Sequence, residues 1–262
     1  PPLPPLEAAA RRLERLLGGG LSDKDHMLHT YTNPAKVVRR WLGTASGAAG
    51  NATPEDISSA AAKLLDPNGH CATGRSLLGA EGAAASMEVE GEGAAATKQL
   101  GFLTSSADRE VESWLMSLLV RLLLKDNKAT EALELAQKAI GILMTHLSTA
   151  EKKITAVSSV SAVSLYPLLA RMFRLRSLVA ESVNDAATSA ALRQDMAKAY
   201  NMACLRRDVD CQATLLNLMM RDLLLNLQGK LLFVGIIGTL TVHGFLVYMY
   251  SLISNTDTIL NF

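Results

Sequence analysis

Aromatic side chains are scarce in this chain of 262 residues. They make up 5% of it, although hydrophobic residues as a group reach 49% and alanine and leucine dominate them. A β-sandwich core draws on β-branched and aromatic residues, whereas alanine and leucine are strong helix formers. The shortage therefore argues against a β-sandwich and favours an all-α fold, in a chain long enough to bury a core of its own.

An excess of charge of either sign is also missing. The chain has 26 Lys and Arg against 25 Asp and Glu, which gives a formal net charge of +1. No strong overall field therefore attracts nucleic acid or an acidic substrate. Cysteines are few as well: there are three, at irregular spacing. An odd number without a regular pattern predicts a reducing compartment rather than a disulfide framework.

The first part of the chain, residues 1–65, predicts short helices. The amphipathic stretch 6–17 forms the first of them and ends at three consecutive glycines. Asn33 and Thr53 are each followed directly by a proline, which is the pattern of a helix N-cap and first helical residue. Residues 66–105 are rich in Gly, Ala, Ser and Glu and have almost no aliphatic periodicity. They predict a flexible linker.

Helical periodicity resumes in residues 106–227. Apolar residues recur at intervals of three and four, and small residues alternate with large ones. This alternation suits antiparallel helical hairpins, because alanines let neighbouring helix axes approach. The predicted fold is all-α, with a TPR-like helical-repeat solenoid in this region and a hydrophobic helix at the C-terminus. The residues expected to pack the hairpins are Trp114, Leu118, Leu133 and Ala136 in one, and Leu215, Leu218 and Met219 in the next.

Individual residues predict helix boundaries within this region. Asn127 is expected to cap the start of one helix, and Pro167 to kink or break another that starts near Thr149. Asp208 and Asp210 are expected at the start of the last helix, where carboxylates accept hydrogen bonds from free backbone N–H groups. The apolar surface of that helix should be buried against its neighbours, and it comprises Ala213, Leu215, Leu216, Leu218, Met219, Leu223 and Leu224.

The most specific pattern lies between Leu205 and Leu223, and it reads L-R-R-D-x-D-x-Q-A-T-L-L-N-L-x-x-R-D-L. It resembles the segment that precedes the PCI domain in the family of third non-ATPase regulatory subunits of the 26S proteasome. The stretch from Glu110 to Ala139 is similar to the family's entry into its helical repeats. Together with weaker likenesses, the resemblance covers roughly half of the chain.

The resemblance implies a non-catalytic scaffold subunit of the regulatory-particle lid that supports ubiquitin-dependent protein degradation. Its partners would be other lid and base subunits of the proteasome, without nucleic acid, in the cytoplasm and nucleus. Two other hypotheses stay open. One is a tail-anchored membrane adaptor with a helical-repeat cytosolic domain. The other is a PCI-type scaffold of a related assembly, such as the signalosome or a translation-initiation complex.

The chain departs from the family after Leu225. Where the family continues into further helices and a winged-helix PCI module, residues 228–262 form a hydrophobic tail. Residues 231–253 contain no Asp, Glu, Lys or Arg and are long enough to cross a bilayer core of about 30 Å. Three interpretations stand: a gene-model artefact in a chain truncated before the PCI module, a membrane-anchoring helix, and a buried helix. The first is preferred, because a lid subunit needs its PCI module and has no reason to enter a membrane.

Catalytic chemistry is not indicated by any motif. His26 and His29 lie three residues apart, but further ligands for a zinc site are missing. Cys204 and Cys211 form no CxxC motif and are interpreted as buried structural thiols. Cys71 follows a histidine, but the pair falls in the predicted linker, where nothing would orient a nucleophile and its base. The sequence therefore predicts no enzyme, no cofactor and no metal site.

Arginines gather in the second half of the chain. Arg171, Arg174 and Arg176, together with Arg206 and Arg207, are a candidate basic stripe for RNA or for an acidic partner. With so few aromatic residues, a stacking platform for single-stranded nucleic acid is not expected. The preferred interpretation is that these arginines lie on ordinary solvated faces of helices.

Overall fold

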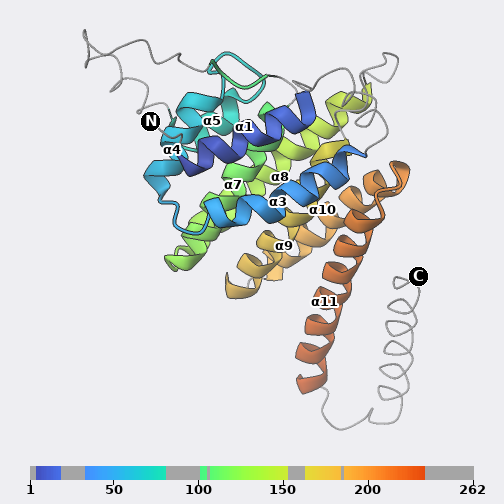
Figure 1. Ribbon diagram of the computed structural model, residues 1–262. Helices are drawn as coiled ribbons and strands as arrows, with labels where there is room; N and C mark the ends of the chain where they lie inside the picture. Colours follow the sequence, from blue (N-terminus) through green and yellow to red (C-terminus); the bar gives the residue numbers. More distant parts are fainter. Residues whose placement is uncertain are drawn as a thin grey trace, which may run out of the picture. The chain divides into compact units, whose positions relative to one another are not determined.

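A computed structural model describes residues 4–18, 33–80, 101–104, 107–152, 163–183 and 186–233. All regular secondary structure in these ranges is helical, which confirms the all-α prediction. The chain divides into two compact units, Pro1–Leu218 and Met219–Phe262. The helices of the first unit can be followed in Figure 1 from blue at the N-terminus to orange.

The N-terminal part of the described chain forms α1 (Pro5–Gly18), α3 (Pro34–Ala48), α4 (Pro54–Leu64) and α5 (Ala72–Leu77). Helices α3 and α4 begin directly after the predicted caps Asn33 and Thr53. Oδ1 of Asn33 accepts a hydrogen bond from the backbone N–H of Ala35 at 3.0 Å. Thr53 forms a capping box with Asp56, in which each side chain accepts a hydrogen bond from the backbone of the other. These caps form as predicted because the hydrogen bonds of each cap are made with residues two or three positions further along the chain.

Helix α5 lies within the range that was predicted to be a linker. The sequence shows no periodicity there, but Cys71, Arg75 and Leu78 are all buried in and beside this short helix. Tertiary burial stabilises it, because a six-residue helix is not stable by itself. The prediction of a flexible linker is therefore wrong for residues 72–77, and residues 81–100 lie outside the described part of the chain.

The later helices are α7 (Asp108–Lys125), α8 (Ala129–Lys152), α9 (Tyr166–Val183), α10 (Ala186–Leu205) and α11 (Val209–Phe233). Helix α8 packs against both α7 and α9, and these three helices form the centre of the first unit (Figure 1). Helices α1 and α4 pack on α7, and α3 contacts α9. In a solenoid each repeat contacts only its neighbours in the chain. The helices of residues 1–65 instead cover the same core as the later ones, so a repeat solenoid is not confirmed.

Three predicted boundaries differ from the structure. Asn127 has a positive φ of 59° and ends α7, because its N–H bonds the carbonyl of Leu124 and the next N–H bonds that of Leu123. Asparagine suits this left-handed position at a helix C-terminus as well as it suits an N-cap. Helix α8 continues through Thr149 without a new start. Pro167 is the second residue of α9, where its missing N–H costs nothing, and it does not break a helix.

Two tryptophans join the N-terminal helices to the central ones. The rings of Trp41 and Trp114 meet edge to face, with their centroids 5.0 Å apart and their planes at 63°. The indole N–H of Trp41 donates to the backbone carbonyl of Ala9 at 2.9 Å, so α1, α3 and α7 meet here. Such aromatic pairs add about 0.5–1.5 kcal/mol to the free energy of burial.

The predicted packing residues are mostly in the core. Trp114, Leu118, Ala136, Leu215 and Leu218 are buried, whereas Leu133 and Met219 are partly exposed. The apolar surface predicted for the last helix is buried only in part.

The hydrophobic tail is described only as far as Phe233, where α11 ends. Residues 234–262, and with them most of the apolar stretch 231–253, lie outside the described residues. Among the helices that the structure does describe, none is long and apolar enough to cross a membrane.

Candidate functional site

The corner between α10 and α11 is built by its own backbone. Arg207 has a positive φ of 54°, and its N–H bonds the carbonyl of Cys204, while the N–H of Asp208 bonds that of Ala203. Asp208 then caps α11, because its Oδ1 accepts the N–H of Cys211 at 2.9 Å. This confirms the prediction that an aspartate opens the last helix.

The same aspartate also joins two helices that are far apart in the sequence. Nη2 of Arg39, on α3, lies 2.7 Å from Oδ1 of Asp208, and Nη1 lies 2.6 Å from Oδ2 of Asp210. Asp208 is buried, so its charge needs this partner, whereas Asp210 is exposed and contributes less. The sequence shows the caps but not this bridge, because the pairing depends on the packing of α3 beside α9 and α11.

A cavity of about 300 Å³ opens beside this bridge. It is lined by α3, α9 and α11, through Arg39, Leu42, Pro167, Ala170, Arg171, Arg174, Asp210, Cys211 and Thr214. We call it the arginine cavity. Arg39 is already balanced by the two aspartates, so the remaining charge of the lining comes from Arg171 and Arg174.

Arginines repel one another around this cavity. Arg171 and Arg174 lie one turn apart on α9, and Arg121 of α7 is near enough to act on Arg171. Burial lowers the pKa of Arg171, and the charges of Arg121 and Arg174 lower it further. Nε of Arg171 is buried without a hydrogen-bond partner. In the described part of the chain, none of the three forms an ion pair.

The predicted basic stripe is therefore divided. Arg176 is only 1% exposed, and its Nη1 lies 2.7 Å from Oδ2 of Asp195, so it serves the packing of α9 against α10. Arg206 and Arg207 belong to the α10–α11 corner. Only Arg171 and Arg174 face the arginine cavity. Sequence spacing alone cannot make this division, since all three arginines of α9 occur within two turns.

A second group of polar side chains is buried between α5, α7 and α8. Oε2 of Glu112 lies 3.1 Å from Nε2 of His146, and Oε1 of Glu112 has no hydrogen-bond partner. Burial raises the pKa of the Cys71 thiol well above its usual range, and the charge of Glu112 raises it further. A reactive cysteine needs a lowered thiol pKa and a base, so this arrangement favours an inert thiol.

Glu110 is a further buried carboxyl group on α7. It accepts a hydrogen bond from Oγ of Ser164. Burial raises its pKa from 4.5 to about 7, although the hydrogen bond from Ser164 acts in the opposite direction. The folded state therefore holds a proton that the unfolded state releases above pH 4.5. By linkage, stability falls as the pH rises from about 4.5 to about 7 and changes no further above that range.

The cysteine and histidine predictions have mixed outcomes. Cys211 is buried as predicted, and burial raises its thiol pKa to about 12, whereas Cys204 is exposed. The prediction that both are buried is thus wrong for Cys204. His26 and His29 lie outside the described residues. Across the ranges that the structure describes, no group of three or more His, Cys, Asp or Glu side chains is arranged to hold a metal ion.

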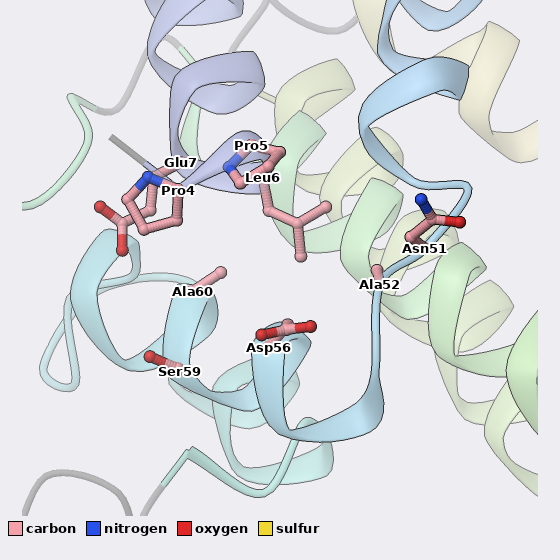
Figure 2. A pocket seen from close by; sticks show the side chains of 9 residues that line it. All are labelled: Pro4, Pro5, Leu6, Glu7, Asn51, Ala52, Asp56, Ser59 and Ala60. Atoms are coloured by element: carbon pink, nitrogen blue, oxygen red, sulfur yellow. The ribbon is translucent and has the colours of Figure 1, made fainter. Parts of the chain in front are cut away.

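A smaller cavity of about 170 Å³ lies between the start of α1 and α4. Figure 2 shows the side chain of Leu6 pointing across it towards Asp56. Its two carboxylates are already engaged, because Glu7 pairs with Lys63 at 2.9 Å and Asp56 belongs to the capping box of α4. Neither carboxylate of the lining is therefore free to bind a ligand.

Large apolar side chains are exposed along the α10–α11 corner and the first part of α11. Val209 is 60% exposed and Leu216 is 46% exposed, and Leu205, the last residue of α10, is also exposed. Val209 and Leu216 are seven residues apart, which places them on one face of α11 two turns apart. We call these three residues the α11 stripe. Leu216, and Leu223 one further interval along, were predicted to be buried, and the structure shows both exposed.

Comparisons with known proteins give no relative: no family model matches the chain, and neither a curated protein nor a solved structure does so.

Proposed function

We propose that this protein is a non-catalytic scaffold subunit of the 26S proteasome regulatory-particle lid. It would support ubiquitin-dependent protein degradation in the cytoplasm and nucleus by binding other lid and base subunits through its helices. The family resemblance between Leu205 and Leu223 suggests the assembly. The packed hairpin of α7 and α8, joined by a three-residue turn, fits a finer proposal of degenerate TPR-like repeats, with the N-terminal helices packed on them.

The observation that carries the proposal is the α11 stripe. The sequence places Leu216 in a helix face that was expected to be buried, but in the structure Leu216 is exposed, together with Val209 on the same face of α11. Exposed apolar residues that follow one helix face are typical of a surface that another protein covers. The stripe also lies within the segment that resembles the lid subunits. A neighbouring lid subunit that packs a helix along α11 would bury it.

Affinity purification of the tagged full-length chain from cells, in buffer with ATP, tests the proposal. Mass spectrometry should find proteasomal ATPases and lid subunits in amounts comparable to the chain. Leu216→Ser should reduce that recovery strongly, because it places a hydroxyl group in the centre of the apolar contact.

Leu178→Ser is the matched control. Leu178 is 44% exposed, nearly the same as Leu216, but it lies on α9 outside the α11 stripe. Its recovery of proteasome subunits should equal that of the wild type, and both variants should melt at the wild-type temperature. Recovery of signalosome or translation-initiation subunits without proteasomal ATPases would contradict the proposal. Equal loss in both variants would show that the stripe is not the contact.

A further inference from the structure

Some of the arginines in and near the arginine cavity have no ion-pair partner in the described part of the chain. Arg39 is balanced by Asp208 and Asp210, and Arg176 by Asp195, so both serve the packing of helices. Arg121, Arg171 and Arg174 have no such role within the described chain. Like charges held together without a counter-charge destabilise the folded state.

The position of Arg171 increases this destabilisation of the folded state. Its Nε is buried without a partner, although an arginine side chain can normally turn its donors to solvent or to a carbonyl. Both burial and the neighbouring arginines lower its pKa. An anion that entered the cavity would supply an acceptor for the guanidinium groups that line it and would also relieve the repulsion between Arg171 and Arg174.

The shape and composition of the cavity indicate which anion. At about 300 Å³ it is at the small end of ligand pockets, large enough for a carboxylate with the side chain that bears it. Leu42, Pro167 and Ala170 give it an apolar side next to the arginines. The lining has no aromatic residue on which a base could stack, which disfavours nucleic acid. Asp210 in the lining would repel a doubly charged phosphate more strongly than a single carboxylate.

We infer that the arginine cavity binds an acidic segment of a partner protein, in which glutamate or aspartate alternates with apolar residues. The carboxylates would pair with Arg171 and Arg174, since the planar guanidinium group binds a carboxylate through two hydrogen bonds. The apolar residues of the segment would pack on Leu42 and Pro167. The inference rests on the proposed scaffold function, because it assumes a protein partner, and it adds a second contact distinct from the α11 stripe.

Fluorescence anisotropy with the purified full-length chain tests this. The probe is a labelled synthetic peptide of alternating glutamate and leucine, and the reference peptide carries glutamine in place of each glutamate. The acidic peptide should bind and the glutamine peptide should bind at least about tenfold more weakly, as expected when charge-assisted hydrogen bonds are lost.

Two variants of equal charge locate the site. Arg174→Gln changes an exposed side chain of the cavity and should weaken binding about tenfold or more. Arg12→Gln removes an exposed arginine of α1, outside the cavity, and should weaken binding less than about twofold at physiological salt. Equal effects of the two variants, or no effect of Arg174→Gln, would overturn the inference.

A third variant distinguishes an arginine that binds a ligand from one that only stabilises the fold, through its melting temperature and its peptide binding. Arg171→Met should raise the melting temperature of the free chain, because it removes a partly buried charge that has no ion-pair partner, and should also abolish peptide binding. A lower melting temperature would show that Arg171 stabilises the fold, and the inference would then be wrong. Displacement of the peptide by inorganic phosphate at equal concentration, or tighter binding of a single-stranded oligonucleotide, would also overturn it.

The inference and the proposed function can fail separately. If proteasome subunits co-purify equally with the wild type and with Arg174→Gln, and the peptide does not bind, the scaffold function stands and the acidic contact is refuted. If the peptide binds at the arginine cavity but no proteasome subunit co-purifies, the acidic contact stands and the identity of the assembly is refuted.

Discussion

Gly74 is the position where a single added methyl group should have the clearest effect. A Cβ atom at this residue of α5 would lie 1.9 Å from Oε1 and 2.5 Å from Cδ of Glu112. Such contacts are far inside van der Waals distance, so either the carboxylate or α5 must move in Gly74→Ala. Glu112 has little freedom to do so, because it is fully buried and its Oε2 contacts His146 at 3.1 Å.

The expected magnitude follows from three contributions. Overpacking a core costs about 1–3 kcal/mol. Loss of the hydrogen bond between Glu112 and His146, which involves a charged group, costs about 1.5–3 kcal/mol. Alanine is favoured over glycine in a helix by about 1 kcal/mol, which offsets part of this. The free energy of unfolding of Gly74→Ala should therefore fall by about 2–4 kcal/mol, which for a chain of this size lowers Tm by about 5–15 °C.

Thermal and urea unfolding of four proteins tests this reasoning: wild type, Gly74→Ala, Glu112→Ala and the double variant. The three atoms nearest to the added methyl group all belong to the Glu112 side chain and are absent from Glu112→Ala, so Gly74→Ala should cost little in that background. The coupling between the two sites should amount to about 2 kcal/mol or more. Gly141→Ala is the control, because Gly141 lies in a helix with open space around its Cβ position. Its Tm should stay the same or rise.

An equal cost of Gly74→Ala in both backgrounds would refute the clash with Glu112. The destabilisation would then have to come from the backbone of α5 itself.

Three further predictions concern other buried residues. Relative to Glu110→Gln, which cannot titrate, the wild type should lose about 3 kcal/mol of stability between pH 4.5 and about pH 7. Urea unfolding at each pH measures this, and parallel curves would show that Glu110 does not titrate there. Asp195→Ala leaves Arg176 buried without its partner and should cost about 2–3 kcal/mol, since Asp195 is partly exposed. The same truncation at the exposed Lys138, whose partner is 3.8 Å away, should cost less than about 0.5 kcal/mol, and similar losses would contradict the reasoning. Leu215→Ala should cost about 2–5 kcal/mol in chemical unfolding, and an unchanged midpoint would place Leu215 outside the core.

Features that depend on neighbouring residues could be predicted from the sequence. Asn33, Thr53 and Asp208 all cap helices as expected, because each cap is completed within three residues along the chain. Asn127 shows the limit of such signals. The same short side chain suits an N-cap and a left-handed C-terminus, and only the turn between α7 and α8 decides between them.

Features of the candidate site could not be predicted in this way. The bridge from Arg39 to Asp208 joins residues 169 positions apart, and the contact of Glu112 with His146 spans 34. Arg171 and Arg176 look alike in the sequence, yet one faces a cavity and the other is buried against Asp195. Helix α5 has no periodic pattern and exists because the core covers it.

Composition, periodicity and caps by themselves determined that this protein is helical, where most of its helices begin, and which faces of those helices are apolar. These properties follow from backbone hydrogen bonding and side-chain spacing over a few residues. The tertiary structure alone decided which apolar faces are buried against other helices of the chain and which side chains stay exposed on α11. It also decided which arginines were neutralised and which were left facing the arginine cavity. Burial and charge pairing between distant helices depend on how the helices pack, and no local pattern encodes that.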